Sequence, residues 1–61
     1  MKRRDLLEHL FKNSCIFVRE GGSHSIYENP LNKRRTAVPR HREIAELTVI
    51  KICKQLEIPI P

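Results

Sequence analysis

The sequence predicts an α+β fold in which two helices cover one face of a three-stranded antiparallel sheet, in the order α-β-β-β-α. Three observations predict this two-layer sandwich. Amphipathic segments occupy both ends of the chain, β-branched and aromatic residues fill its middle, and two turn signals divide that middle into three strands. The chain has 61 residues, a length that suits one domain, and we expect residues 1–61 to form it.

Two helices are predicted from apolar residues at helical spacing. The first spans residues 3–12, and Asn13 follows it as a residue that tolerates the left-handed conformation at a helix end. The second spans residues 42–57, and Pro59 prevents its continuation. The apolar stripe of the first helix consists of Leu6, Leu7, Leu10 and Phe11, and that of the second of Ala45, Val49, Ile52, Cys53 and Leu56.

Three strands are predicted in the middle of the chain from its β-branched and aromatic residues. Gly21-Gly22 is a two-residue hairpin signal, because both positions of such a turn can require a positive φ. In the second turn, residues 29–32, Asn32 can take a positive φ. Pro39 ends the last strand, because proline has no N–H to continue the ladder. The predicted strands span residues 15–20, 23–28 and 33–38.

The chain carries a net charge of +5, because 12 lysines and arginines outnumber 7 acidic residues. This excess favours a polyanionic partner, either nucleic acid or an acidic protein. Binding to an anionic membrane surface requires a basic amphipathic helix. The positive charge of this chain is spread over loops and strands as well, so we expect no membrane contact. A merely soluble basic surface is the plain alternative.

Cys15 and Cys53 are the only cysteines, and neither lies in a C-x-x-C pair or at a spacing typical of zinc ligands. We expect both to be buried thiols that act as small apolar residues, and a disulfide between them stays open. We expect a cytoplasmic protein without a signal peptide, because Met1 is followed by a basic and then amphipathic segment. No segment is long and apolar enough to cross a membrane.

His24 is the candidate catalytic residue, because it opens the second strand directly after Gly21-Gly22. A rigid hairpin would hold its imidazole, which titrates near neutral pH, in one place for proton transfer. RNA suits this chemistry, because its 2′-hydroxyl is a built-in nucleophile against the adjacent phosphate. The acidic residues are scattered along the chain, so we expect neither a metal nor another cofactor. A surface histidine without a role is the alternative.

Candidate RNA contacts surround this histidine. A basic run on the third strand would bind phosphates, and its plain alternative is a charged edge strand that discourages aggregation. Strand alternation points Arg34 and Arg35 to opposite faces, so at most one of them shares the face of His24, and it points Ser23 away from its neighbour. Tyr27 can stack on a base, although strand tyrosines more often pack half-buried. The full candidate set is Arg19, Ser23, Tyr27, Lys33, Arg34, Arg35 and Arg40.

The run Gly22-Ser23-His24-Ser25-Ile26-Tyr27, followed by Val38-Pro39 and then His41, resembles the HicA (YcfA-like) toxin family of prokaryotic toxin–antitoxin systems. The resemblance covers nearly the whole chain. Two positions depart from the family pattern. Ser14 stands where many members have a glycine, and residues 42–46 run where many have a Gly-Thr pair entering the last helix.

The resemblance implies an mRNA interferase with a fold like that of double-stranded-RNA-binding domains. Such proteins cut RNA without a metal, and the histidine of the motif, here His24, is catalytic. Gly22 and Ser23 then shape the turn. The implied partners are mRNA and a HicB-type antitoxin, which often covers that histidine, in a higher-order toxin–antitoxin complex.

The residues alone are compatible with three functions. An endoribonuclease toxin uses His24 for catalysis and the basic strands for substrate binding. A non-catalytic RNA-binding module uses the same cationic face, with His24 as one contact among many, and its affinity falls steeply with salt. An interaction protein pairs its charge with an acidic partner and has no salt-sensitive RNA affinity.

Overall fold

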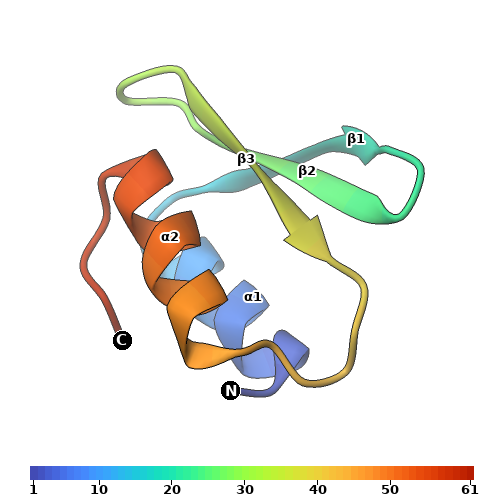
Figure 1. The fold of residues 1–61 in the computed structure, drawn as a ribbon. Coiled ribbons are helices and arrows are strands. Elements are labelled where there is room, and N and C mark those ends of the chain that lie inside the picture. The colour runs from blue at the N-terminus through green and yellow to red at the C-terminus, as the bar shows by residue number, and fades with distance from the viewer.

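The computed structural model describes all 61 residues, and it has a helix, three strands and a second helix in chain order. The predicted α+β class and element order are confirmed. Both helices lie on one side of the sheet, and the other face of the sheet is uncovered (Figure 1). The elements are α1 (Arg3–Lys12), β1 (Ile16–Glu20), β2 (His24–Asn29), β3 (Arg34–Pro39) and α2 (Glu46–Leu56).

The sheet is antiparallel with β2 in the centre, and its register decides which side chains share a face. Directly opposed residues of neighbouring strands lie on the same face, and successive residues alternate between faces except where the register of β1 shifts between Phe17 and Arg19. Ser25 lies opposite Glu20 and Val38, and Val38 is buried in the core. The face of Ser25 therefore points to the helices, and the face of His24 and Ile26 points away from them.

The core lies between the two helices and the sheet. α1 contributes two fully buried leucines, but Phe11, which falls on the predicted stripe, is 80% exposed. Cys15 and Cys53 are buried free thiols, as predicted. The nine core residues are Leu6, Leu10, Cys15, Val38, Ile44, Val49, Ile52, Cys53 and Leu56. Neither helix has the length and apolar character needed to span a bilayer.

The second helix begins at Glu46, four residues later than predicted, because the N-terminal segment forms hydrogen bonds with the backbone of the residues before it. Arg3 N–H donates to the Arg42 carbonyl oxygen at 2.8 Å, and Ile44 N–H donates to the Met1 carbonyl oxygen at 2.7 Å. These bonds hold residues 42–44 extended beside the start of α1. Helical periodicity at residues 42–45 was therefore a misleading signal, since tertiary pairing satisfies the same backbone groups.

The left-handed residues lie one position beyond those that the sequence predicts. Asn13 has φ −100°, and its side-chain Nδ2 donates to the His9 carbonyl oxygen at 2.9 Å, while Ser14 takes φ 66°. In the second turn, Lys33 takes φ 64° in place of Asn32. Both asparagines therefore serve these turns through side-chain hydrogen bonds, and the positive φ falls on the next residue.

The turn between β2 and β3 is fastened to the end of α2. Asn29 and Asn32 both donate from Nδ2 to the Leu56 carbonyl oxygen, at 2.9 and 3.0 Å. This carbonyl is one of the groups that a helix leaves without an intrahelical partner at its C-terminus. Two asparagines thus join the far end of the sheet to α2.

Candidate active site

The hairpin between β1 and β2 carries the candidate catalytic histidine. Gly21 N–H donates to the His24 carbonyl oxygen at 2.8 Å and closes the loop. The prediction of a positive-φ turn is wrong, because neither glycine has a positive φ. Gly21 has a different constraint: a Cβ atom there would lie 3.3 Å from the His24 carbonyl oxygen, whereas one on Gly22 would meet nothing within 4 Å.

The imidazole of His24 is exposed on the face of the sheet that the helices leave uncovered. The Ser23 hydroxyl lies 3.1 Å from its Nδ1. This contact corrects the expectation that Ser23 points to the opposite face, because β2 begins at His24 and Ser23 belongs to the turn. Nε2 has no hydrogen-bond partner within the chain, so it can meet a ligand directly.

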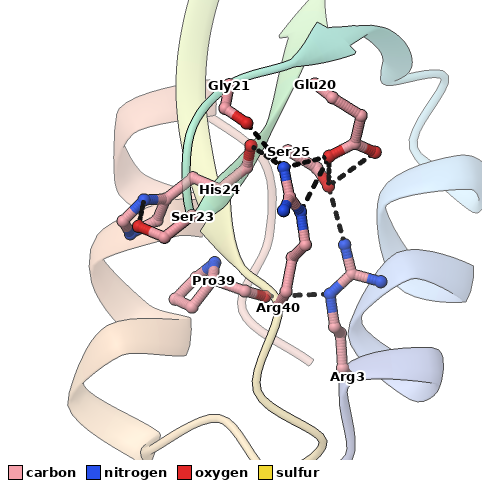
Figure 2. A network of polar contacts seen from close by, with 8 residues as sticks. All are labelled: Arg3, Glu20, Gly21, Ser23, His24, Ser25, Pro39 and Arg40. Atoms are coloured by element: carbon pink, nitrogen blue, oxygen red, sulfur yellow. Dashed lines mark hydrogen bonds and ion pairs between the residues drawn. The ribbon is translucent and has the colours of Figure 1, made fainter.

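One arginine clamps both ends of this loop. The Arg40 guanidinium contacts the Glu20 carboxylate through Nε at 2.8 Å and Nη2 at 2.7 Å. The same Nη2 donates to the Gly21 carbonyl oxygen at 2.6 Å and to that of His24 at 3.3 Å (Figure 2). Arg40, which the sequence suggested as an RNA contact, is thus occupied within the protein.

A second arginine ties the hairpin to α1. Arg3 donates from Nε to the Pro39 carbonyl oxygen at 2.8 Å and from Nη2 to Ser25 Oγ at 2.9 Å. Ser25 Oγ lies 3.0 and 3.1 Å from the two carboxylate oxygens of Glu20 (Figure 2). The hydroxyl of Ser25, a buried residue, therefore accepts from Arg3 and donates to Glu20, so one chain of hydrogen bonds links α1, β2 and β1.

Two of the other candidate RNA contacts share the face of His24. Arg19 is opposed to Ile26 and is exposed, and Arg35 lies opposite Glu28, with which it forms an ion pair of 2.7 Å. Ile26 and Glu28 lie two and four residues after His24 in β2, so their side chains share its face. The opposed residues Arg19 and Arg35 therefore point to the same side of the sheet as His24.

The remaining candidates lie elsewhere. Arg34 is on the helix-facing side and pairs with Glu57 at 2.9 Å, and Lys33 is exposed in the turn at the far end of the sheet. Tyr27 is half-buried against the core, with its ring edge-on to Phe17 at a centroid distance of 5.7 Å. Tyr27 therefore does not share the face of His24.

Arg3, Glu20 and Ser25 also belong to the site, although the sequence does not mark them as candidates. The pairing of Glu20 with Ser25 follows from the hairpin register, whereas a two-residue turn at Gly21-Gly22 would have placed Glu20 opposite Ser23. Arg3 comes from more than twenty residues away, and no local pattern marks it. No group of three or more His, Cys, Asp and Glu side chains is placed to hold a metal ion.

Six of the seven acidic side chains form ion pairs within the protein, and the cations that remain without an ion-pair partner are exposed to a ligand, apart from the hydrogen-bonded Arg3. A cleft of about 350 Å³ at the start of α1 is lined entirely by charged side chains, Lys2, Arg4, Arg42 and Glu43. The lysines and arginines without an ion-pair partner are Lys2, Arg3, Arg19, Lys33, Arg42, Lys51 and Lys54.

Comparison with known families decides what kind of protein carries this hairpin. The family model described as the HicA toxin of bacterial toxin–antitoxin systems matches residues 3–58. The chain belongs to the HicA toxin family. As a HicA-type protein it is the toxin of a toxin–antitoxin system, and membership implies an antitoxin partner and an RNA substrate. No curated protein and no solved structure matches it.

Proposed function

We propose that this HicA-type toxin is a metal-independent endoribonuclease, an mRNA interferase, with His24 as its proton-transfer residue. The observation that supports this most strongly is the exposed imidazole on a hairpin loop fastened at both ends, with Nε2 open to a ligand. General acid–base catalysis needs such a side chain within hydrogen-bond reach of the reacting group and held in one geometry.

In the proposed reaction, Nε2 of His24 removes the proton of a ribose 2′-hydroxyl. The 2′-oxygen then attacks the adjacent phosphorus, and the bond from phosphorus to the 5′-oxygen breaks as that oxygen takes a proton. The products are a 2′,3′-cyclic phosphate and a 5′-hydroxyl. The tautomer suited to this step carries its proton on Nδ1, and this N–H donates a hydrogen bond to the Ser23 hydroxyl oxygen.

The cations near His24 provide the remaining parts of the site. Arg19 points to the same side as the imidazole and has no ion-pair partner, so it is the candidate to stabilise charge on the pentacovalent phosphorus. Arg35 shares this side but lies opposite Glu28, four residues along β2 from His24, and would contact a phosphate further along the RNA. Lys33 is exposed near the other end of β2, about 17 Å from His24 at strand spacing, and would contact a phosphate several nucleotides away, whereas Arg34 points to the helix side and pairs with Glu57.

The biological setting that we propose follows the family. The substrate is mRNA in the cytoplasm, and the antitoxin is a HicB-type protein that binds over His24 and excludes RNA. Toxin and antitoxin assemble into a higher-order complex. An exposed imidazole supports this mode of inhibition, because a protein that covers the hairpin would block it without unfolding the toxin.

The test is cleavage of a single-stranded RNA in EDTA by the purified protein and by His24→Ala. Loss of a general base lowers the rate by about 10²–10⁴-fold. His9→Ala is the matched control, because His9 bonds the Pro59 carbonyl oxygen and takes no part in the hairpin. A 2′-deoxy nucleotide at the cut should block the reaction. Equal cleavage by the protein and by His24→Ala would refute the role of His24.

A non-catalytic RNA-binding module is the second candidate, and the free cations favour it as much as they favour a nuclease. It predicts RNA affinity that falls steeply with salt and no strand scission under any condition. An RNA that stays intact through long incubation with saturating protein, while still binding it, would select this alternative.

A further inference from the structure

We infer that Arg40 and Glu20 are positioning residues that set the conformation of the His24 hairpin, and that Arg40 is not an RNA contact. This inference rests on the proposed function only for what it says about the rate of cleavage. Its structural part, that the loop depends on this ion pair, stands apart from whether the protein cuts RNA.

The edge of the Arg40 guanidinium that would bind a phosphate through two N–H groups is occupied, and only Nη1 has no partner within the protein. Nε donates to Glu20 Oε1, and Nη2 contacts the Glu20 carboxylate and two backbone carbonyl oxygens. Arginine recognises a phosphate through two parallel N–H groups, and here the edge formed by Nε and Nη2 already faces a carboxylate. Its charge is also balanced by that carboxylate, whereas Arg19 has no ion-pair partner.

The conformation of the loop depends on contacts from outside it, because the residues of the loop constrain its backbone little. Gly21 and Gly22 have the widest conformational freedom of any residues, and neither takes the positive φ of a primed two-residue turn. One backbone hydrogen bond closes the loop, from Gly21 to His24. Arg40 Nη2 holds the carbonyl oxygens of the same two residues, so the end of β3 fixes both sides of the loop.

Glu20 is in turn held in place from the interior. Ser25, 1% exposed, donates to the Glu20 carboxylate and accepts from Arg3, which is itself anchored on the Pro39 carbonyl oxygen. The carboxylate therefore meets donors from two sides, Ser25 and Arg40 (Figure 2). A side chain fixed in this way can orient Arg40, and through it the backbone of His24.

Measurements of RNA affinity and of cleavage rate distinguish a positioning role of Arg40 from a phosphate contact. RNA affinity is measured in the His24→Ala background, so that no substrate is consumed, by anisotropy of a labelled single-stranded oligonucleotide. Arg40→Gln and Arg19→Gln each remove one positive charge. We expect Arg19→Gln to weaken binding and to lower the slope of log affinity against log salt by about 0.7. Arg40→Gln should leave that slope unchanged, because the slope counts the phosphates contacted, and it should lower affinity less than Arg19→Gln does, through the Glu20 carboxylate that it leaves unpaired.

In the catalytically active protein, Arg40→Gln should change kcat and leave substrate binding nearly the same. Misplacement of a catalytic group by about 1 Å costs about 10²-fold in rate, so we expect Arg40→Gln to lower kcat by about 10- to 100-fold with little change in KM. Arg40→Lys should behave similarly, because an ammonium keeps the charge but cannot reproduce the guanidinium fork. Rescue by lysine would instead indicate a phosphate contact.

Glu20→Gln gives a result of opposite sign in the two assays. It removes a negative charge beside the site, so RNA affinity should stay the same or rise, while kcat should fall as the hairpin loses its clamp. A residue that merely supports the fold would lower both together. The thermal midpoint of each variant is measured as a control for the global fold.

Amide hydrogen exchange of Gly21 provides a readout that does not need nuclease activity. Its N–H is bonded to the His24 carbonyl oxygen, and we expect exchange to quicken at least several-fold in Arg40→Gln but not in Arg19→Gln. Unchanged exchange, or a loss of RNA affinity equal to that of Arg19→Gln, would overturn the inference. Failure of the unmodified protein to cleave RNA would refute the proposed function alone.

Discussion

The Ser23 hydroxyl lies 3.1 Å from Nδ1 of His24, at the tip of the first hairpin. This contact couples two neighbours that strand alternation would have separated. It also links the orientation of the ring to its tautomer, because Nδ1–H can donate a hydrogen bond to the Ser23 oxygen, which leaves Nε2 unprotonated.

Ser23→Ala should therefore slow cleavage without abolishing it. A hydrogen bond of this kind contributes about 0.5–1.5 kcal/mol, which corresponds to a loss in rate of about 2- to 12-fold. The measurement is single-turnover cleavage, together with the ¹⁵N shifts of the His24 ring, which should show more of the Nε2-protonated tautomer. An unchanged rate together with unchanged ring shifts would contradict the coupling.

Ser14→Gly should stabilise the fold, because Ser14 takes φ 66° at the end of α1 and its side chain is exposed. A left-handed residue with a Cβ atom costs about 1–2 kcal/mol, of which glycine recovers about 1 after its own entropy cost. The thermal midpoint should rise by about 4–8 °C. Ser14→Ala is the control, because it keeps the Cβ atom, and an equal rise in that variant would count against backbone strain as the cause.

Asn29→Ala should destabilise the protein more than Asn32→Ala. Both side chains donate to the Leu56 carbonyl oxygen and each accepts one backbone N–H, that of Leu31 for Asn29 and that of Arg34 for Asn32, but Asn29 is only 4% exposed. Leaving buried groups without partners costs about 1–3 kcal/mol, whereas the more exposed Asn32 should cost about 0.5–1 kcal/mol. Urea unfolding measures both, and the reverse order would contradict the proposed attachment of the turn to α2.

The stability of the protein should fall as the pH rises above about 9. Burial raises the pKa of Cys15 and of Cys53 above the ordinary value of 9.0, and for Cys15 the neighbouring Cys53 raises the pKa further. Both thiols then keep their protons in the folded chain at a pH where the unfolded chain has lost them, so this stabilisation is complete below pH 9 and is lost above it.

Urea unfolding at about pH 7 and about pH 10 tests this expectation. The comparison is with Cys15→Ala/Cys53→Ala, which isolates the contribution of the two thiols. The double variant is less stable at both values, because it leaves space in the core, but its free energy of unfolding should depend less on pH. The same pH dependence in both proteins would exclude the thiols as its cause.

Local patterns predicted the elements well, because apolar periodicity and turn residues decide them without reference to the rest of the chain. Helix α1 has the predicted bounds, and every strand lies within one residue of its predicted ends. The start of α2 was wrong because the backbone of residues 1–3 pairs with residues 42–44, a contact between the two ends of the chain.

The candidate site likewise has residues that a local pattern marks and residues that only tertiary contacts bring to it. His24 stands out locally, since it follows a glycine pair and opens a strand. The hydrogen bonds around Ser25 depend on the register of β1 on β2 and on a guanidinium from α1, neither of which a local motif contains. Arg40 was identified by its charge, but only its placement beside Glu20 separates a clamp from a phosphate ligand.

Chemical rescue tests the central role of the His24 imidazole most directly. His24→Gly leaves an exposed gap on the hairpin, and the rate of RNA cleavage is measured in EDTA as free imidazole is added. We expect the variant to cleave at least about 10²-fold more slowly than the unmodified protein and to recover part of that rate in proportion to the imidazole concentration. Cleavage by His24→Gly at the full rate, with no imidazole present, would contradict the account.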